Sequence, residues 1–148
     1  MAKVCYEAES IIDRDRLIQM IRDAQHPTSP GEIVASCAVQ TALEIDAKYI
    51  IVFSETGAQA RLVSRWRPKQ YILVFSDDIK VVRQMTVSRA TKGFHIQSFA
   101  GRKKLLLSVL KQYVNDGKLK TGDRVVVVHG TQELAPEESN IMRVMTVE

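Results

Sequence analysis

The fold is decided by residues 49–66, YIIVFSETGAQARLVSRW. The continuous apolar run at 49–53 is typical of a strand that is buried on both faces of a sheet. Apolar residues then recur with helical spacing from Ala58 to Trp66, and the helix is expected to end before Pro68. A buried strand followed directly by an amphipathic helix is the repeating unit of a parallel α/β sheet.

The same alternation extends to both sides of this unit. Ser29 is a predicted N-cap, with Pro30 at the first helical position and Glu32 at capping-box spacing, and the helix runs to about Asp46. Its expected buried face is Ile33, Val34, Cys37, Ala38, Thr41, Ala42 and Ile45, with Cys37 as a small apolar core residue. Further along, the pattern predicts a strand at 71–75, a helix at 79–91 stopped by Gly93, a strand at 94–99, a helix at 102–114, and strands at 125–129 and 141–147.

These elements predict an α/β fold of three layers, α/β/α, around a five-stranded, mostly parallel sheet. Only about ten residues and no helix separate the last two strands, which is too short for a parallel crossover, so the last strand is expected to be antiparallel. Residues 1–28 are predicted as a helical lead, with Asp13 as an internal N-cap, and residues 29–148 as the α/β domain.

Composition narrows the class of protein. The chain has 148 residues, of which 45% are hydrophobic and 26% charged, as in one ordinary globular domain, and it is too short for a (β/α)8 barrel of about 250 residues. Its two cysteines form no C-x-x-C pair, which argues against a zinc or redox site. It contains no signal-peptide core and no apolar run of about 18 residues, so we expect a cytoplasmic protein without a membrane partner.

The positive charge is concentrated in the middle of the chain. Residues 61–124 carry 15 basic and 4 acidic side chains, whereas the flanking segments are both net acidic. Solvated helix faces and phosphate recognition are both compatible with this pattern. Nucleic acid is not expected as a partner, because the basic residues lack interleaved stacking aromatics and no reader motif is present.

Ligands of an open parallel sheet bind beyond the carboxyl ends of its strands. The most informative such segment is Ser54-Glu55-Thr56-Gly57, where backbone N–H groups at a helix start, two hydroxyls and an accessible Gly57 backbone favour an anion; plain helix capping is the alternative. The segment 76–78 is predicted as an acidic helix cap. No catalytic motif is present, and the three histidines are interpreted as structural, with only His129 expected near the ligand zone.

The chain resembles the C-terminal domain of pyruvate kinase almost from end to end. The residues that carry this resemblance are SETG at 54–57 followed by ARLVSRWRP at 60–68, TGDRVVVV at 121–128, Asn140 with MRV at 142–144, PTS at 27–29 with Glu32, and MAKVCYEAE at 1–9. The last of these is similar to the final helix of that family's catalytic barrel domain. The resemblance therefore implies that the lead belongs to a preceding barrel and exposes an apolar stripe.

The resemblance implies a glycolytic phosphotransferase as the parent enzyme, which converts phosphoenolpyruvate and ADP to pyruvate and ATP with magnesium and potassium. The family's catalytic and metal residues lie in the barrel and lid domains, so no catalytic residue and no cofactor is expected in this domain. By itself the chain is predicted to form no ATP in a coupled assay.

In the family this domain binds a sugar-bisphosphate effector and makes one contact of a homotetramer. The expected function is therefore allosteric regulation and oligomerisation, the latter through the helix at 30–46 and the edge of the last strand. A stand-alone sugar-phosphate-binding module is the alternative, and the helical lead argues against it.

By resemblance, the effector phosphate is expected on Ser54, Thr56, Gly57, Gln59, Lys103 and Lys104. This chain departs from the family at the second phosphate. It has Gly57-Ala58-Gln59 where Gly-Arg-Ser or Gly-Thr-Thr is common, and the tryptophan that often faces that phosphate has no counterpart. Glu133, Glu137 and Glu138 lie in the last loop. Because carboxylates repel phosphates, we expect weak or absent activation by fructose bisphosphate, which leaves open a monophosphorylated effector on the Ser54–Gly57 loop.

Overall fold

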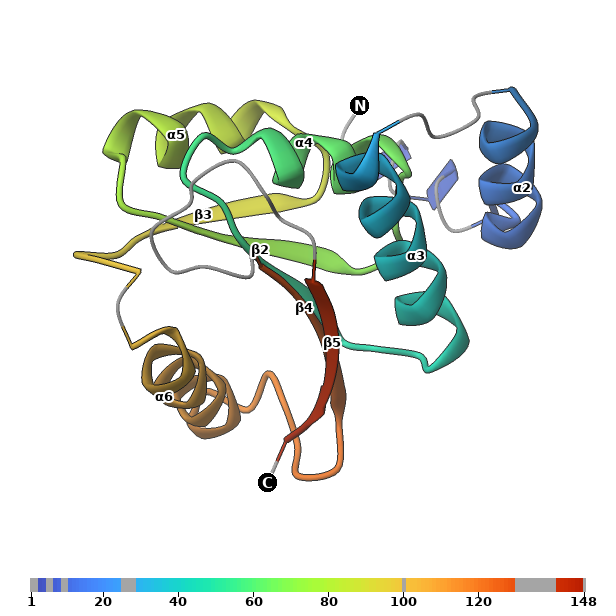
Figure 1. Cartoon of the computed structure of the whole chain (residues 1–148). Coiled ribbons are helices and arrows are strands. Elements are labelled where there is room, and N and C mark those ends of the chain that lie inside the picture. The colour runs from blue at the N-terminus through green and yellow to red at the C-terminus, as the bar shows by residue number, and fades with distance from the viewer. Residues whose placement is uncertain are drawn as a thin grey trace.

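The computed structural model describes residues 3–4, 7–8, 11–24, 29–99, 101–129 and 141–147. A five-stranded sheet in the order β3-β2-β1-β4-β5 forms its centre (Figure 1). The strands are β1 (Tyr49–Phe53), β2 (Tyr71–Ser76), β3 (Thr91–His95), β4 (Arg124–His129) and β5 (Ile141–Thr146). The helices are α2 (Arg14–Ala24), α3 (Pro30–Glu44), α4 (Ala58–Arg65), α5 (Ile79–Gln84), the 3-10 turn η1 (Met85–Val87) and α6 (Arg102–Asn115).

The sheet is parallel except at one edge. β1 pairs in parallel with β2 and β4, with Val52 opposite both Val74 and Val128, and β3 continues the parallel order beyond β2. β5 runs antiparallel to β4. The predicted three-layer α/β class with an antiparallel last strand is therefore confirmed.

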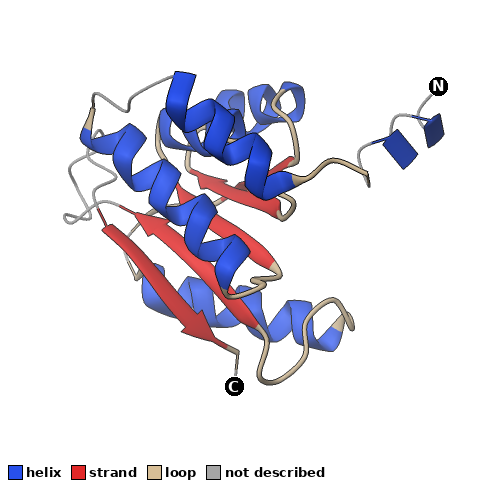
Figure 2. Cartoon of the chain, turned by 90° about the vertical axis from the view of Figure 1, so that its right-hand side faces the viewer, coloured by secondary structure: helices blue, strands red, loops and turns tan. Residues whose placement is uncertain are grey.

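Helices cover both faces of the sheet. Figure 2 shows the helical layers on either side of the strands, with α3, α4 and α5 on one face and α6 on the other. Alternate strand residues divide between the two faces: Ile50 and Val52 point toward the α3 layer, whereas Ile51 and Phe53 point toward α6. Burial on both faces explains why these strands are apolar without interruption.

The prediction for residues 79–99 was wrong in detail. The structure has a short α5 and η1 in place of one helix, and β3 begins at Thr91 and ends at His95 instead of occupying 94–99. Gly93 does not stop a helix but lies within β3, where a Cβ would come 2.6 Å from the backbone oxygen of Val82. The close packing of α5 on β3 therefore requires glycine at this position.

The predicted N-cap of α3 is confirmed, since the Glu32 amide donates to Ser29 Oγ at 3.2 Å. The predicted buried face was wrong in part, because Ile33 and Cys37 are exposed. The helix buries its smallest side chains instead, and these are Ala35, Ser36, Ala38, Val39 and Ala42. Small side chains let α3 pack close to the sheet, and the helix face with Ile33 and Cys37 points outward. Cys37 is therefore a free surface thiol rather than a core residue.

The N-terminal lead packs loosely on α3. Asp13 caps α2 as predicted, accepting from the Arg16 amide at 3.2 Å, and Ile18 is buried in the core cluster. Residues 3–4 and 7–8 of the predicted first helix are helical, and the rest of that segment and residues 25–28 lie outside the described residues. None of the helices described is long and apolar enough to span a membrane.

Two side chains at the end of α6 have raised pKa values. Burial, with a contribution from Tyr49, raises the pKa of Tyr113, whose ring meets that of Tyr49 edge to face at 5.3 Å. A hydrogen bond to Asp116 raises the pKa of Lys118, with Nζ and Oδ2 2.9 Å apart. Because Tyr49 is the first residue of β1, these side chains lie at the amino ends of the parallel strands, opposite their carboxyl ends.

Candidate functional site

The turn between β1 and α4 brings three of the predicted site residues together at the carboxyl edge of the sheet. Ser54 is buried, and its amide donates to the Phe75 carbonyl at 3.1 Å, which fixes the start of the turn to β2. Thr56 is exposed, and its Oγ1 accepts from the Ala58 amide at 3.3 Å. The Thr56 hydroxyl proton is thus free to point outward to an acceptor.

The topology gives this turn a special position. From β1 the chain proceeds outward through β2 to β3 and then returns to β4 on the other side of β1. The strand order therefore reverses between β1 and β4, and the crevice at such a switch point is where open α/β sheets bind ligands. Residues 130–140, which follow β4, lie outside the described residues. The predicted repulsion of a phosphate by Glu133, Glu137 and Glu138 therefore stays a prediction.

Gly57 is required for packing, and its expected role in the approach of a ligand to the backbone stays a prediction. Its φ of 73° lies in the left-handed region, and a Cβ there would come 2.9 Å from both Met85 Cε and Val81 Cγ1. The space beside Gly57 is thus filled by side chains of η1 and α5.

Arg61 is a candidate residue that the sequence analysis missed. Its Nη1 would lie 3.2 Å from a Cβ at Gly57, so the guanidinium folds back over the turn. Within the described residues no hydrogen bond or ion pair engages this side chain. Arg61 follows Gly57 by four residues, so both lie on one face at the start of the helix. This spacing is the sequence signal that could have identified Arg61.

The other predicted phosphate residues belong to helices and not to the turn itself. Gln59 is buried and its Nε2 donates to the Gly31 carbonyl at 2.9 Å, so this amide links α4 to the start of α3. Lys103 and Lys104 are exposed in the first turn of α6, which covers the opposite face of the sheet. Their role in binding stays a prediction.

An open cleft of about 700 Å³ lies beside the turn, along the carboxyl ends of β1, β2 and β3. Glu55, Asp77, Asp78 and Lys80 give this cleft its charged lining, and His95 lines it as well. Asp78 caps α5 as predicted, accepting from the Lys80 amide at 2.8 Å. His95, expected only as a strand residue, lies at this edge with Nε2 3.1 Å from the Asp77 carbonyl oxygen. Three carboxylates make this side of the site unfavourable for a phosphate.

Ser76 connects the turn to the start of α5. It is fully buried, and its hydroxyl donates to the Glu55 carbonyl at 3.1 Å while accepting from the Asp78 amide at 3.2 Å. One hydroxyl thus satisfies a carbonyl of the β1–α4 turn and an amide of the β2–α5 turn. The sequence pattern gave no sign of this bridge.

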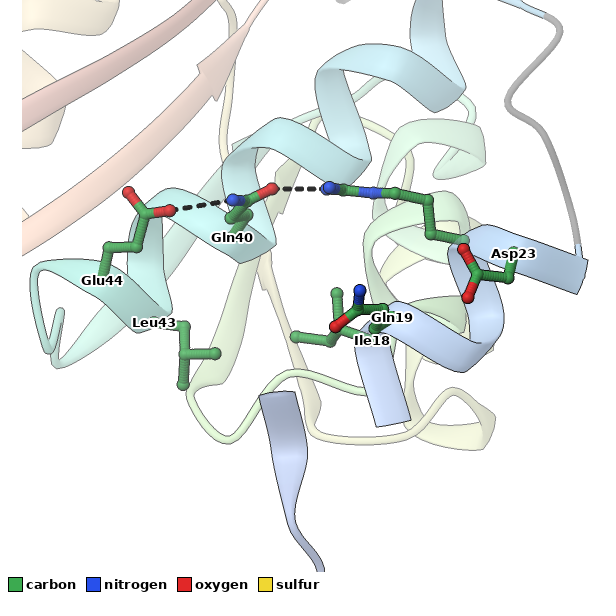
Figure 3. Close-up of a pocket in the computed structure, with 7 residues that line it drawn as sticks. Ile18, Gln19, Asp23, Gln40, Leu43 and Glu44 are labelled. Atoms are coloured by element: carbon green, nitrogen blue, oxygen red, sulfur yellow. Dashed lines mark hydrogen bonds between the residues drawn. The ribbon is translucent and has the colours of Figure 1, made fainter. Parts of the chain in front are cut away.

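A second hollow, of about 350 Å³, lies between α2 and α3 (Figure 3). Arg22 donates to Gln40 Oε1, and Gln40 Nε2 in turn donates to Glu44 Oε1 at 2.8 Å. Ile18 and Leu43 line the same hollow. The two hydrogen bonds through Gln40, together with the apolar side chains of Ile18 and Leu43, hold α2 against α3.

The structure offers no evident catalytic centre within its described ranges. No three His, Cys, Asp or Glu side chains come together there as a metal ion would require. Among the titratable groups of the turn and the cleft, none is enclosed in the way that an acid or base catalyst commonly is. The chemistry supported by the β1–α4 turn is the binding of an anion.

A family model described as "Pyruvate kinase, alpha/beta domain" matches residues 32–145. The pyruvate kinase of Eimeria tenella is 35% identical over 100% of this chain and 28% of its own length, and that of Dictyostelium discoideum is 38% identical over 99% and 30%. A crystal structure of a Cryptosporidium parvum pyruvate kinase superposes with a TM-score of 0.88 at 29% identity, covering 98% of this chain and 28% of that one. The chain thus spans less than a third of the length of these relatives.

Proposed function

Because the chain belongs to the pyruvate kinase family, as its C-terminal α/β domain, we propose that it is a regulatory and assembly domain. Its regulatory part is the β1–α4 turn, which binds one phosphate group of a small phosphorylated effector. Its assembly part is the surface around α3 and β5, which joins a second copy of the chain. The parent reaction, with its magnesium, potassium and ADP or ATP, is proposed for the other domains of the family and is assigned to no residue here.

The regulatory proposal rests on one observation. Three kinds of group that can donate hydrogen bonds to an anion come together at the turn. Gly57 has no side chain to cap α4, and Thr56 Oγ1 holds the Ala58 amide. The next N–H groups of the first turn and the positive end of the helix are available. The Thr56 hydroxyl and the Arg61 guanidinium lie at the same place. A guanidinium beside free backbone amides at a helix start is well suited to a phosphate.

The same surroundings favour a single phosphate over two. Gln59, at a position where the family often supplies a further donor, is held by the Gly31 carbonyl. The cleft on the other side carries Glu55, Asp77 and Asp78. A second phosphate on this effector would therefore meet carboxylates on that side and gain little.

A thermal-shift titration tests this proposal. Glucose 6-phosphate at a hundred times its Kd is expected to raise the Tm by about 5–10 °C. Fructose 1,6-bisphosphate is expected to give no larger shift at the same concentration, because its second phosphate finds no donor. Strong stabilisation by the bisphosphate alone would overturn the single-phosphate site, and no shift with either sugar would overturn the regulatory proposal.

The assembly proposal is supported by an open sheet edge. β5 is an outermost strand, and Val144 on it is 42% exposed, on the same face of the sheet that α3 covers. Ile33 is exposed on the outer surface of α3. Unpaired strand edges with exposed apolar side chains pair readily with another copy, and a two-fold contact needs one self-complementary surface.

Substituting Val144→Lys is expected to weaken self-association about tenfold, because a lysine on an edge strand disfavours pairing of two edges. Sedimentation velocity over a concentration series measures the dissociation constant. Val87→Lys is the matched control, because Val87 is also an exposed valine but lies on η1. A wild-type chain that stays monomeric at high concentration, or equal effects of both substitutions, would contradict the proposed interface.

The N-terminal lead is proposed to pack against the barrel domain of the parent enzyme. Ile11 is 84% exposed, and Val4 and Met20 are exposed as well, whereas Ile18 on α2 turns inward to the core. Large apolar side chains gathered on one short segment are typical of a contact surface. This assignment of residues 1–28 follows the family resemblance and is supported by that exposed set.

A further inference from the structure

We infer that Ser76 is the positioning residue of the β1–α4 turn, and that its hydroxyl joins the turn and the start of α5 into one unit. The binding half of this inference rests on the phosphate site proposed above. The structural half stands on the hydrogen bonds of Ser76 and on the packing of α5.

The first support is the double hydrogen bond of a side chain that has no access to water. Ser76 Oγ lies 3.1 Å from the Glu55 carbonyl oxygen and 3.2 Å from the Asp78 amide nitrogen, and the residue is 0% exposed. Removing the hydroxyl leaves a carbonyl of one turn and an amide of the other without this partner, and no water can reach the vacated position without local opening.

The second support is the fit of α5 between two glycines. On one side, Val81 and Met85 occupy the space beside Gly57, and on the other side Val82 lies against Gly93. Neither contact leaves room for a methyl group. α5 therefore cannot move closer to the turn or to β3 without a clash, and moving it away from either would leave a cavity.

The third support is the position of the phosphate donors relative to this unit. Glu55, whose carbonyl Ser76 holds, immediately precedes Thr56, and Arg61 folds back over Gly57. A small rotation of the turn would therefore change the relative placement of hydroxyl, amides and guanidinium together. Phosphate binding requires these donors to converge, so the Ser76 bridge determines affinity although Ser76 itself touches no ligand.

The test compares Ser76→Ala with Ser64→Ala. Ser64 is the matched control because it is also a buried serine whose hydroxyl donates to a distant carbonyl, that of Arg89, at 2.7 Å. Ser64→Ala loses one buried hydrogen bond and Ser76→Ala loses two, so both variants are expected to be destabilised, Ser76→Ala by more. Ser76→Thr retains the hydroxyl and is the conservative variant.

Two readouts are taken on each variant, amide hydrogen exchange and the affinity for glucose 6-phosphate. In Ser76→Ala, exchange is expected to accelerate about fivefold or more both at residues 55–57 and at residues 78–80, with a loss of affinity of about fivefold. Ser64→Ala is expected to leave both unchanged, and Ser76→Thr to restore both.

Each possible outcome either supports or overturns the inference about Ser76. Acceleration in only one of the two segments, or the same pattern in Ser64→Ala, would overturn the inference. If Ser76→Ala accelerates both segments while its affinity equals that of the wild type, the unit exists but Ser76 does not position the site, which also overturns it. If the wild type binds no glucose 6-phosphate, the proposed function fails, and the exchange pattern alone then confirms or overturns the joined unit.

Discussion

Replacing Gly93 by alanine is expected to destabilise the domain by about 3 kcal/mol or more, a large share of the stability of a protein of this size. A Cβ at this position would lie 2.6 Å from Val82 O and 3.0 Å from Val82 Cα. Both are backbone atoms of α5, so no side-chain rotation relieves the overlap. The helix has to move away from β3, and Val81 and Met85 would lose their packing at Gly57 on its other side.

Chemical denaturation followed by circular dichroism measures this loss. Gly117→Ala is the control, because Gly117 has open space around it and alanine there meets only the strain of φ +70°, about 1 kcal/mol. Equal destabilisation by the two substitutions would show that the close approach of α5 and β3 is not a determinant of the fold.

The double substitution Thr56→Ala with Arg61→Ala is expected to abolish measurable binding of glucose 6-phosphate. Each donor contributes about tenfold through a hydrogen bond to a charged group, and together they account for up to about a hundredfold if their effects add. Alanine is the best helix former, so Arg61→Ala keeps α4 intact. Isothermal titration calorimetry on the single and double variants measures the loss.

The control for this experiment is Thr86→Ala with Arg83→Ala. Thr86 is an exposed threonine whose hydroxyl donates to the Arg83 carbonyl at 2.7 Å, and both residues lie away from the β1–α4 turn in sequence. This pair is expected to bind glucose 6-phosphate as the wild type does. Equal losses in both double variants would indicate a diffuse charge effect instead of a defined site.

Much of the fold was predictable because the central strands are buried on both faces. The runs at 49–53 and 125–128 are apolar at every position, and both form strands there. The caps Ser29 and Asp78 were predictable because capping is a local interaction between neighbours in the sequence. The antiparallel last strand followed from the length of its connection alone.

The errors occurred where tertiary packing overrides a local pattern. Gly93 resembles a helix stop in the sequence, but its function is set by Val82 across the interface. On α3 the apolar spacing pointed to Ile33 and Cys37, whereas the sheet selected the smallest side chains for contact. Neither outcome can be predicted from the local sequence pattern, because each depends on the element that packs against these residues.

The candidate site was predictable only in its backbone. The strand-to-helix junction identified Ser54, Thr56 and Gly57, and the structure places them in one turn. The contact of Gln59 with Gly31 and the position of α6, which carries Lys103 and Lys104, on the other face of the sheet depend on contacts far apart in sequence, and the role of these residues in binding stays a prediction. For the same reason Ser76 became visible only in three dimensions, whereas Arg61 could have been found from its four-residue spacing from Gly57.

The central claim, that the β1–α4 turn binds one phosphate, is tested most directly by amide chemical shifts of the labelled chain during titration with glucose 6-phosphate. We expect the largest shifts at residues 56–61 and smaller ones at residues 78–80, transmitted through Ser76. Largest shifts at Lys103 and Lys104 on α6, or no saturable shifts anywhere, would contradict it.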